Sequence, residues 1–72
     1  MNTEQLSFAF FCIENIAERL EISGNLVYKI LTENSNILDN YIIPCTDALH
    51  TQGKEYILND LLEYMREERL IK

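Results

Sequence analysis

Apolar residues recur at three- and four-residue intervals along most of the chain, and this spacing limits the fold more than any other feature. Side chains at such intervals lie on one side of an α-helix. Between Glu4 and Glu21 the predicted apolar face consists of Leu6, Ala9, Phe10, Ile13, Ile16, Ala17 and Leu20. Thr3 is the expected N-cap, and Glu4 suits the positive end of the helix dipole. The segment is therefore predicted to form a long amphipathic helix.

Three further apolar segments follow, separated by residues that favour helix ends. Ser23 is expected to cap a second helix whose buried side consists of Leu26, Val27, Ile30 and Leu31. The next segment, Ile37 to Ile43, should stop or kink at its end, because the residue before a proline avoids the α region. Pro44 suits the first turn of a short helix that reaches Thr51.

The last helix is predicted to run from Lys54 to Leu70. Its apolar face consists of Ile57, Leu58, Leu61, Leu62 and Met65. Gly53 precedes it and is expected to terminate the short helix in a left-handed conformation. Residues 1–72 are thus predicted to form a single all-α domain, a compact bundle of four to five helices with a helix-turn-helix-like pair in the middle.

The small size and acidic charge bound the class of function. A chain of 72 residues buries only roughly 60% of its unfolded surface, so a partner that covers apolar surface would add stability. The net charge of −6 argues against nucleic-acid binding, which needs clustered cations. It favours a basic protein partner or a solvated surface.

Two cysteines and the absence of long apolar runs indicate the compartment. Cys12 and Cys45 have neither CxxC nor metal-ligand spacing and are expected to be reduced, small hydrophobic residues. No apolar run reaches the roughly 18 residues that a membrane helix needs, and no signal-peptide pattern opens the chain. A cytoplasmic protein without a membrane segment is expected.

Asp47-x-x-His50 followed by Thr51-x-Gly53 is the one stretch that suggests chemistry. In a helix Asp47 and His50 can touch, and a carboxylate that orients an imidazole is part of a general-base system. The stretch offers no second histidine or glycine-rich loop, and one histidine with scattered carboxylates lacks metal-ligand spacing. We therefore predict no catalytic residue, metal or cofactor, and interpret the four residues as a capped joint between helices that can serve recognition.

Aromatic residues outside the apolar faces suggest an interaction surface. Phe8 and Phe11 do not fit the face predicted for the first helix, so either another element of the same fold or another chain is expected to cover them. Tyr56 falls outside the apolar face of the last helix, one turn before Asp60, and the two could form a local hydrogen bond or an exposed recognition pair. We predict that Phe8, Phe11, Tyr56 and Asp60 contribute to binding a protein partner or a second copy of the chain.

The segment from Ile16 to Leu31 has the apolar spacing of a DNA-binding helix-turn-helix. Its turn position, which usually holds glycine, is Glu21. The presumed reading helix offers Asn25, Tyr28 and a single cation, Lys29, for contacts to phosphates and bases. DNA-binding regulation is accordingly the alternative to an interaction module, and a small enzyme that uses Asp47 and His50 is the third hypothesis.

Two sequence blocks resemble an uncharacterised family of small bacterial proteins of about this length. The blocks are Phe11-Cys12-Ile13-Glu14 and Asp47-Ala48-Leu49-His50-Thr51-x-Gly53-x-x-Tyr56-Ile57-x-x-Asp60. The chain departs from the family pattern around Pro44-Cys45-Thr46, where the relatives resemble a continuous helix. Members of the family are often encoded beside an ADP-ribosyltransferase-like domain. The resemblance therefore implies a companion, antitoxin-like role for a non-enzymatic protein-interaction module.

Overall fold

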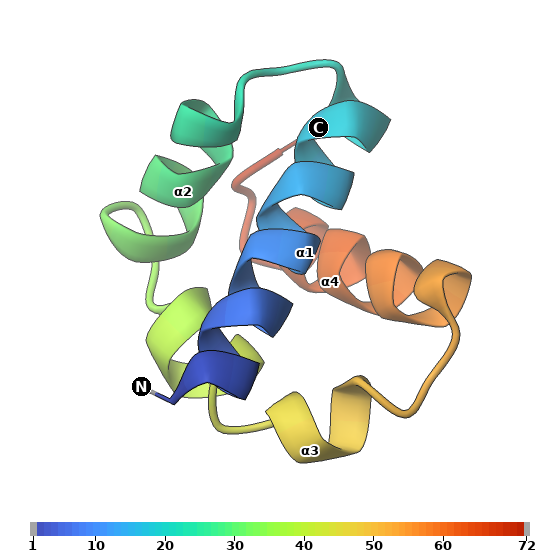
Figure 1. Cartoon of the computed structure of the whole chain (residues 1–72). Helices are drawn as coiled ribbons and strands as arrows, with labels where there is room; N and C mark the ends of the chain where they lie inside the picture. The colour runs from blue at the N-terminus through green and yellow to red at the C-terminus, as the bar shows by residue number, and fades with distance from the viewer. Residues whose placement is uncertain (1, 72) are drawn as a thin grey trace.

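The computed structural model describes residues 2–71, which form four α-helices and one short π-helical turn. The elements are α1 (Thr3–Leu20), α2 (Gly24–Thr32), η1 (Leu38–Ile42), α3 (Thr46–Leu49) and α4 (Lys54–Glu67). In Figure 1, α2 runs back alongside α1, α4 crosses behind α1, and α3 lies at the lower edge between η1 and α4. No strand occurs within the described residues. The prediction of a compact all-α bundle is confirmed.

The first helix begins one residue earlier than predicted. Asn2, not Thr3, is the N-cap: its side chain accepts a hydrogen bond from the Gln5 backbone N–H at 2.7 Å, and Gln5 Oε1 accepts one from the Asn2 N–H at 3.0 Å. This reciprocal pair is a capping box. Gln5 lies three residues after Asn2, so its side chain accepts the hydrogen bond of the Asn2 backbone N–H. A helix capped by Thr3 would leave this N–H without that partner.

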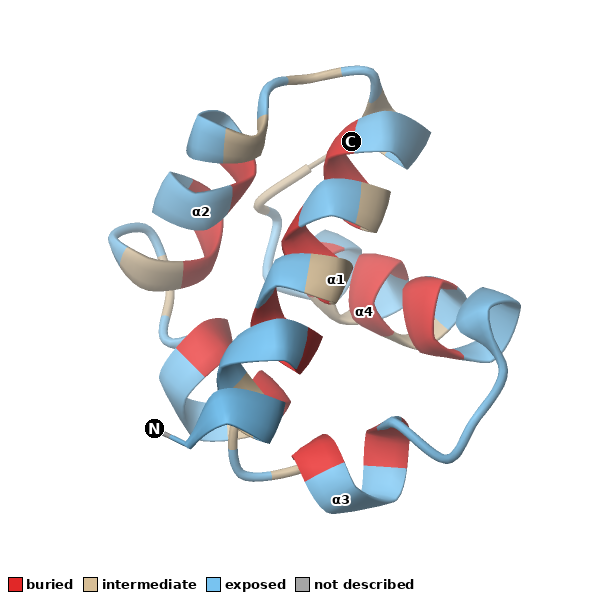
Figure 2. Ribbon diagram, in the orientation of Figure 1, coloured by how far each residue is buried: buried red, intermediate tan, exposed pale blue. Residues whose placement is uncertain are grey.

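The buried face of α1 is rotated relative to the predicted one. Its buried residues are Phe8, Ala9, Cys12, Ile13, Ile16 and Ala17. Leu6 and Phe10, predicted to be buried, are 46% and 56% exposed. The first half of the helix carries apolar residues on two sides, so periodicity alone does not select the side that the other helices cover. Figure 2 shows the buried residues of α1 on the side facing α2 and α4.

The second helix starts as expected and buries less than expected. Ser23 accepts a hydrogen bond from the Leu26 N–H at 3.1 Å, which confirms it as the N-cap. Val27, Ile30 and Leu31 are buried, whereas Leu26 is 45% exposed. The prediction for Leu26 was wrong, because Leu26 lies in the first turn of α2 outside the buried side that Val27, Ile30 and Leu31 form.

The turn between α1 and α2 contains a left-handed residue. Glu21 has φ 58° and ψ 43°. The Ile22 N–H donates to the Ala17 carbonyl at 3.0 Å, and Ile22 is half-buried against the core. These are features of the Schellman motif, whose left-handed position usually holds glycine. The backbone thus has the turn geometry that the helix-turn-helix spacing suggested, with glutamate at the glycine position.

Glu21→Gly is expected to raise the free energy of unfolding by about 0.5–1 kcal/mol. A side chain in the left-handed region costs about 1–2 kcal/mol, and glycine at this position removes that cost. Part of the resulting gain in stability is offset by the greater freedom of glycine in the unfolded chain. Urea unfolding followed by circular dichroism measures the change. A loss of about 1 kcal/mol, as for glycine in an exposed helix interior, would show that Glu21 is helical in solution.

The chain around Pro44 forms a turn between η1 and α3. The predicted helix end at Ile43 is confirmed: Ile43 caps η1, and its N–H donates to the Leu38 carbonyl at 3.0 Å. The short helix that follows is α3, which begins at Thr46 and not at Pro44. Buried Thr46 donates its hydroxyl proton toward the carbonyls of Ile42 at 3.1 Å and Ile43 at 2.9 Å. These bonds join the end of η1 to the start of α3.

Gly53 does not have the predicted left-handed conformation. Its φ is −71° and its ψ is 155°, and it is the N-cap of α4. The expectation was wrong because α3 ends at Leu49, and the bond from the Gln52 N–H to the Leu49 carbonyl turns the chain before Gly53 is reached. The apolar face predicted for α4 is confirmed in full, since Ile57, Leu58, Leu61, Leu62 and Met65 are all buried. The helix ends at Glu67, three residues before the predicted Leu70, and Arg69 follows it with φ 59°.

Both cysteines are free thiols, as expected. Cys12 is fully buried in the core, and this burial raises the pKa of its thiol to about 12. Cys45 is half-buried. None of the helices within residues 2–71 has the length and apolar character needed to cross a bilayer.

Candidate functional site

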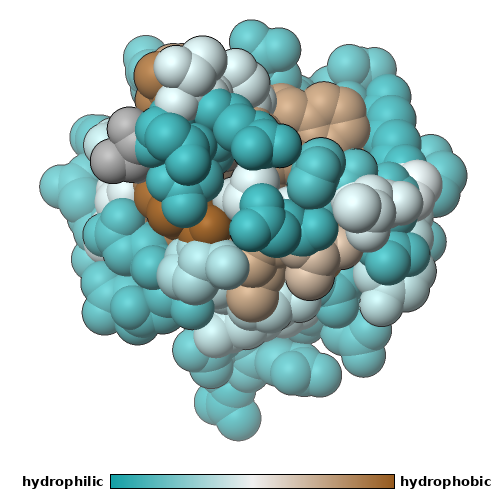
Figure 3. Space-filling view, turned by 60° about the horizontal axis from the view of Figure 1, so that its bottom comes forward, coloured by the Kyte–Doolittle hydropathy of each residue, from teal (hydrophilic) through white to brown (hydrophobic). Residues whose placement is uncertain are grey.

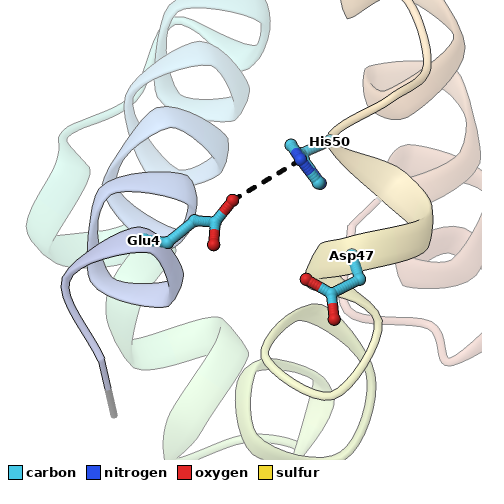
Figure 4. A group of neighbouring side chains, drawn as sticks. All are labelled: Glu4, Asp47 and His50. Carbon is cyan, nitrogen blue, oxygen red and sulfur yellow. Dashed lines mark ion pairs between the residues drawn. The ribbon is translucent and has the colours of Figure 1, made fainter.

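His50 lies at the end of α3 and faces the first turn of α1. Its Nδ1 lies 2.7 Å from the Thr46 carbonyl oxygen, and its Nε2 lies 3.5 Å from Glu4 Oε1. Because a carbonyl only accepts hydrogen bonds, Nδ1 carries the proton of this bond. Figure 4 shows the Glu4 side chain extending from α1 toward the His50 ring, with Asp47 on the same short helix as His50.

Asp47 completes a cluster of three side chains that can ligate a metal ion. One carboxylate oxygen each from Glu4 and Asp47 and a ring nitrogen of His50 lie within 4.8 Å of one another. All three residues are exposed. The predicted neighbourhood of Asp47 and His50 is thus present, and Glu4 is the member that the sequence analysis did not identify. Its position in the first turn of α1 suits the helix dipole, and no local pattern in the sequence connects it with α3.

Thr51 and His50 close the end of α3, as the interpretation of this stretch as a joint predicted. The Thr51 hydroxyl donates to the Ala48 carbonyl at 3.0 Å, and the His50 backbone N–H donates to the Thr46 carbonyl at 2.9 Å. Gly53 contributes the start of α4 in place of a left-handed turn. The Thr51 oxygen is therefore engaged with the backbone in this structure, and His50 Nε2 is directed to Glu4.

Phe8 is covered by the fold, and Phe11 is partly covered. Phe8 is buried, with 7% of its surface exposed, and Phe11 is half-buried against the core. Their rings are stacked, with centroids 6.1 Å apart. They line a hollow of about 190 Å³ together with His50 and Ile57. Of the two expectations for Phe8, cover by another element of the fold is the one that the structure shows, since residues at the end of α3 and the start of α4 lie beside it.

Tyr56 and Asp60 do not form the local pair that was one of the two expectations. Asp60 accepts a hydrogen bond from the Tyr41 hydroxyl, and this bond raises the pKa of Tyr41. Tyr41 also packs on Tyr64, with ring centroids 5.1 Å apart. Asp60 therefore connects α4 to η1 through a partly buried hydrogen bond. Tyr56 is 58% exposed on α4, so of this predicted pair only Tyr56 is free to contact a partner.

The exposed apolar surface lies between α1 and α2. A hollow of about 390 Å³ is lined by Leu6, Ala9, Phe10, Ile13, Tyr28, Thr32, Leu38 and Asp39. A second hollow of about 360 Å³ shares Phe10, Ile13 and Tyr28 with the first and reaches Glu14. We call the two hollows together the α1–α2 groove. From the side shown in Figure 3, most of the molecular surface is hydrophilic and apolar residues are exposed in separate patches.

The sequence alone did not predict the α1–α2 groove. Leu6 and Phe10 fit the predicted apolar face of α1, so they were assigned to the core. Tyr28 follows buried Val27 on α2 and is 52% exposed. A surplus of apolar positions on α1 was the available signal, because a single helix cannot bury both of its sides in a domain this small.

One comparison with known proteins identifies the family. A family model with the description "Protein of unknown function (DUF3791)" matches residues 7–68. The chain belongs to this family. The match to DUF3791 includes both sequence blocks on which the resemblance rested, and it confirms membership of an uncharacterised family. No curated protein and no solved structure matches the chain.

Proposed function

We propose that this domain is a non-enzymatic, cytoplasmic protein-interaction module that binds a helical segment of another protein in the α1–α2 groove. The observation that supports the proposal is the exposure of Phe10 and Tyr28, 56% and 52%, on the two helices that flank the groove. Large aromatic residues exposed beside a hollow are the typical anchors of protein interfaces. An amphipathic helix that lies in such a groove presents apolar residues at helical spacing to it.

The charge around the α1–α2 groove favours a basic partner. Exposed Asp39 lines one hollow and exposed Glu14 lines the other. The whole chain carries a net charge of −6. Lysine or arginine residues at the rim of a bound helix would be attracted to both carboxylates. A second copy of the chain is a poorer partner, because a two-fold interface brings together two copies of the same acidic face.

The protein encoded beside this gene is the partner that we would test first. The family resemblance suggests an ADP-ribosyltransferase-like neighbour, and an acidic helical module that binds it would act as an antitoxin-like companion. The α1–α2 groove supplies the apolar contact for such a role, and Glu14 and Asp39 supply charge complementarity to a basic segment. DNA-binding regulation remains the alternative, in which the exposed residues of α2 contact DNA.

Co-expression of the chain with the adjacent open reading frame, followed by copurification and calorimetry, tests the proposal. Phe10→Ala and Tyr28→Ala are expected to weaken binding by about tenfold or more, because each removes an anchor of the interface. Binding should also weaken as salt is raised, since the rim contacts are exposed ion pairs. Tyr56→Ala is the matched control, because Tyr56 is exposed to a similar extent on α4 and should change affinity by less than about twofold.

Three results would contradict this assignment. Weaker partner binding by Tyr56→Ala but not by Phe10→Ala would show that the interface lies on α4. Homodimerisation that is lost in Phe10→Ala would replace the basic partner by a second copy. Retardation of duplex DNA by the isolated chain at about 50 mM salt would favour the DNA-binding alternative.

A further inference from the structure

The Glu4–Asp47–His50 cluster lies outside the α1–α2 groove. We propose that it is a surface site for a divalent transition-metal ion, with Zn²⁺ as the best-matched ion. Its ligands would be His50 Nε2 and one carboxylate oxygen each from Glu4 and Asp47. The ion would join the start of α1 to α3.

The tautomer of His50 prepares Nε2 for a metal. The Thr46 carbonyl, which is outside the cluster, accepts the hydrogen bond of Nδ1 at 2.7 Å. In the neutral ring the lone pair is then on Nε2, the atom directed to Glu4. Metal-binding histidines typically donate their second N–H to a carbonyl or carboxylate in this way. Thr46 is buried, and its hydroxyl donates to the carbonyls of Ile42 and Ile43. These bonds fix the position of Thr46 and therefore of the carbonyl that orients the His50 ring.

The distance between His50 and Glu4 fits two ligands of one ion better than a direct hydrogen bond. Nε2 and Oε1 are 3.5 Å apart. A charged N–H···O bond usually measures about 2.7–2.9 Å. Two ligands about 2.0–2.2 Å from a tetrahedral zinc ion lie about 3.4 Å from each other. The ligand atoms of the full cluster lie within 4.8 Å of one another, and Asp47 is exposed, so the proposal requires a small rotation of its side chain toward the ion.

The charge and the donor types select the class of ion. The two carboxylates balance the charge of a dication, and the neutral imidazole adds a nitrogen ligand. Imidazole suits zinc, cobalt and nickel, whereas magnesium and calcium prefer oxygen ligands throughout. Three protein ligands leave at least one coordination position for water or for a side chain of a partner.

Titration of the untagged protein with Zn²⁺, followed by thermal unfolding, tests the site. At a Zn²⁺ concentration about tenfold above the dissociation constant, the melting temperature is expected to rise by roughly 5–10 °C and to return after addition of a chelator. Mg²⁺ at the same concentration should leave it unchanged. Co²⁺ should give the visible absorption of a protein-bound ion, which reports binding independently of stability.

Matched variants locate the ligands. Glu4→Gln and His50→Gln should each lower Zn²⁺ affinity by at least about tenfold, while the metal-free proteins keep the helical circular dichroism of the unchanged chain. Glu63→Gln removes an exposed carboxylate from α4 and should change affinity by less than about twofold. Cys45→Ser serves as the thiol control, since this half-buried cysteine precedes α3 and thiolates also bind zinc.

Several outcomes would overturn the assignment. Absence of a thermal shift and of Co²⁺ absorption in the unchanged chain would reduce the cluster to a surface ion pair. Affinity that survives in both Glu4→Gln and His50→Gln would place the ion elsewhere. Loss of affinity in Cys45→Ser alone would assign the binding to the thiol. None of these results bears on the α1–α2 groove, whose test uses different residues.

Discussion

Phe8→Ala is expected to lower the free energy of unfolding by about 3–5 kcal/mol, whereas Phe10→Ala should lower it by less than about 1 kcal/mol. The two rings are two positions apart on α1, yet Phe8 is 7% exposed and Phe10 is 56% exposed. Deleting the buried ring removes its contacts with Phe11 and leaves a cavity at the junction of α1, α3 and α4. In a domain of this size the loss approaches the whole stability of roughly 3–5 kcal/mol.

Urea unfolding at 25 °C, followed by circular dichroism, separates the two cases. Phe8→Ala should be largely unfolded without urea, and Phe10→Ala should have a midpoint close to that of the unchanged chain. Equal losses in both variants would mean that the α1–α2 groove is closed over Phe10 in solution. A larger loss of unfolding free energy in Phe10→Ala than in Phe8→Ala would mean that Phe10 is buried, as the sequence predicted for α1. The proposed interface would then have no basis.

Leu61→Ala is expected to cost about 2–5 kcal/mol, and Leu26→Ala less than about 1 kcal/mol. Leu61 is fully buried near the middle of α4 and belongs to the hydrophobic core, so its removal leaves a cavity there. Leu26 is 45% exposed in the first turn of α2. Alanine at that position loses little burial and gains helix propensity.

Thermal unfolding provides the comparison of the two leucine variants. Leu61→Ala should lower the melting temperature by roughly 10 °C or more, and Leu26→Ala by a few degrees at most. The same substitution is made in both variants, so the difference between them measures burial and not the loss of side-chain atoms. A large loss for Leu26→Ala would show that the start of α2 packs against the core or against another copy of the chain.

Residues on α4 and α1 show when sequence periodicity locates a core. In α4 the aliphatic residues and Met65 lie on one side, and all five predicted core positions are buried. In α1 apolar residues lie on two sides, and the predicted face included exposed Leu6 and Phe10 but omitted buried Phe8 and Cys12. The side of α1 that is covered depends on where α3 and α4 pack, and residues local to α1 carry no information about that.

Gly53 was a misleading signal for a left-handed helix end. The left-handed residues within the described chain are Glu21 and Arg69, whereas Gly24 and Gly53 occupy helix starts with negative φ. Steric preference makes glycine the commonest residue at a left-handed helix end. It does not exclude other residues, because a cost of about 1–2 kcal/mol can be offset by the packing of the next residue, such as half-buried Ile22.

Part of the candidate site could be predicted from local sequence. Asp47 and His50 are neighbours on α3, and His50 and Thr51 close the end of this helix, as their spacing indicated. The role of Glu4 could not be predicted, because its proximity to His50 results from the packing of the first turn of α1 beside α3. The same holds for the bond between Tyr41 and Asp60, which joins η1 to α4.

The sequence by itself determined the helical class, the Ser23 cap, the break at Pro44 and the buried side of α4. Each of these depends on interactions among residues within about two helical turns, which any isolated segment already contains. Only the tertiary structure decided which side of α1 is covered, and with it the exposure of Phe10 and the meeting of Glu4 with His50. These features depend on how helices from distant parts of the chain pack together, and the packing is chosen by the total apolar area that all the helices bury at once.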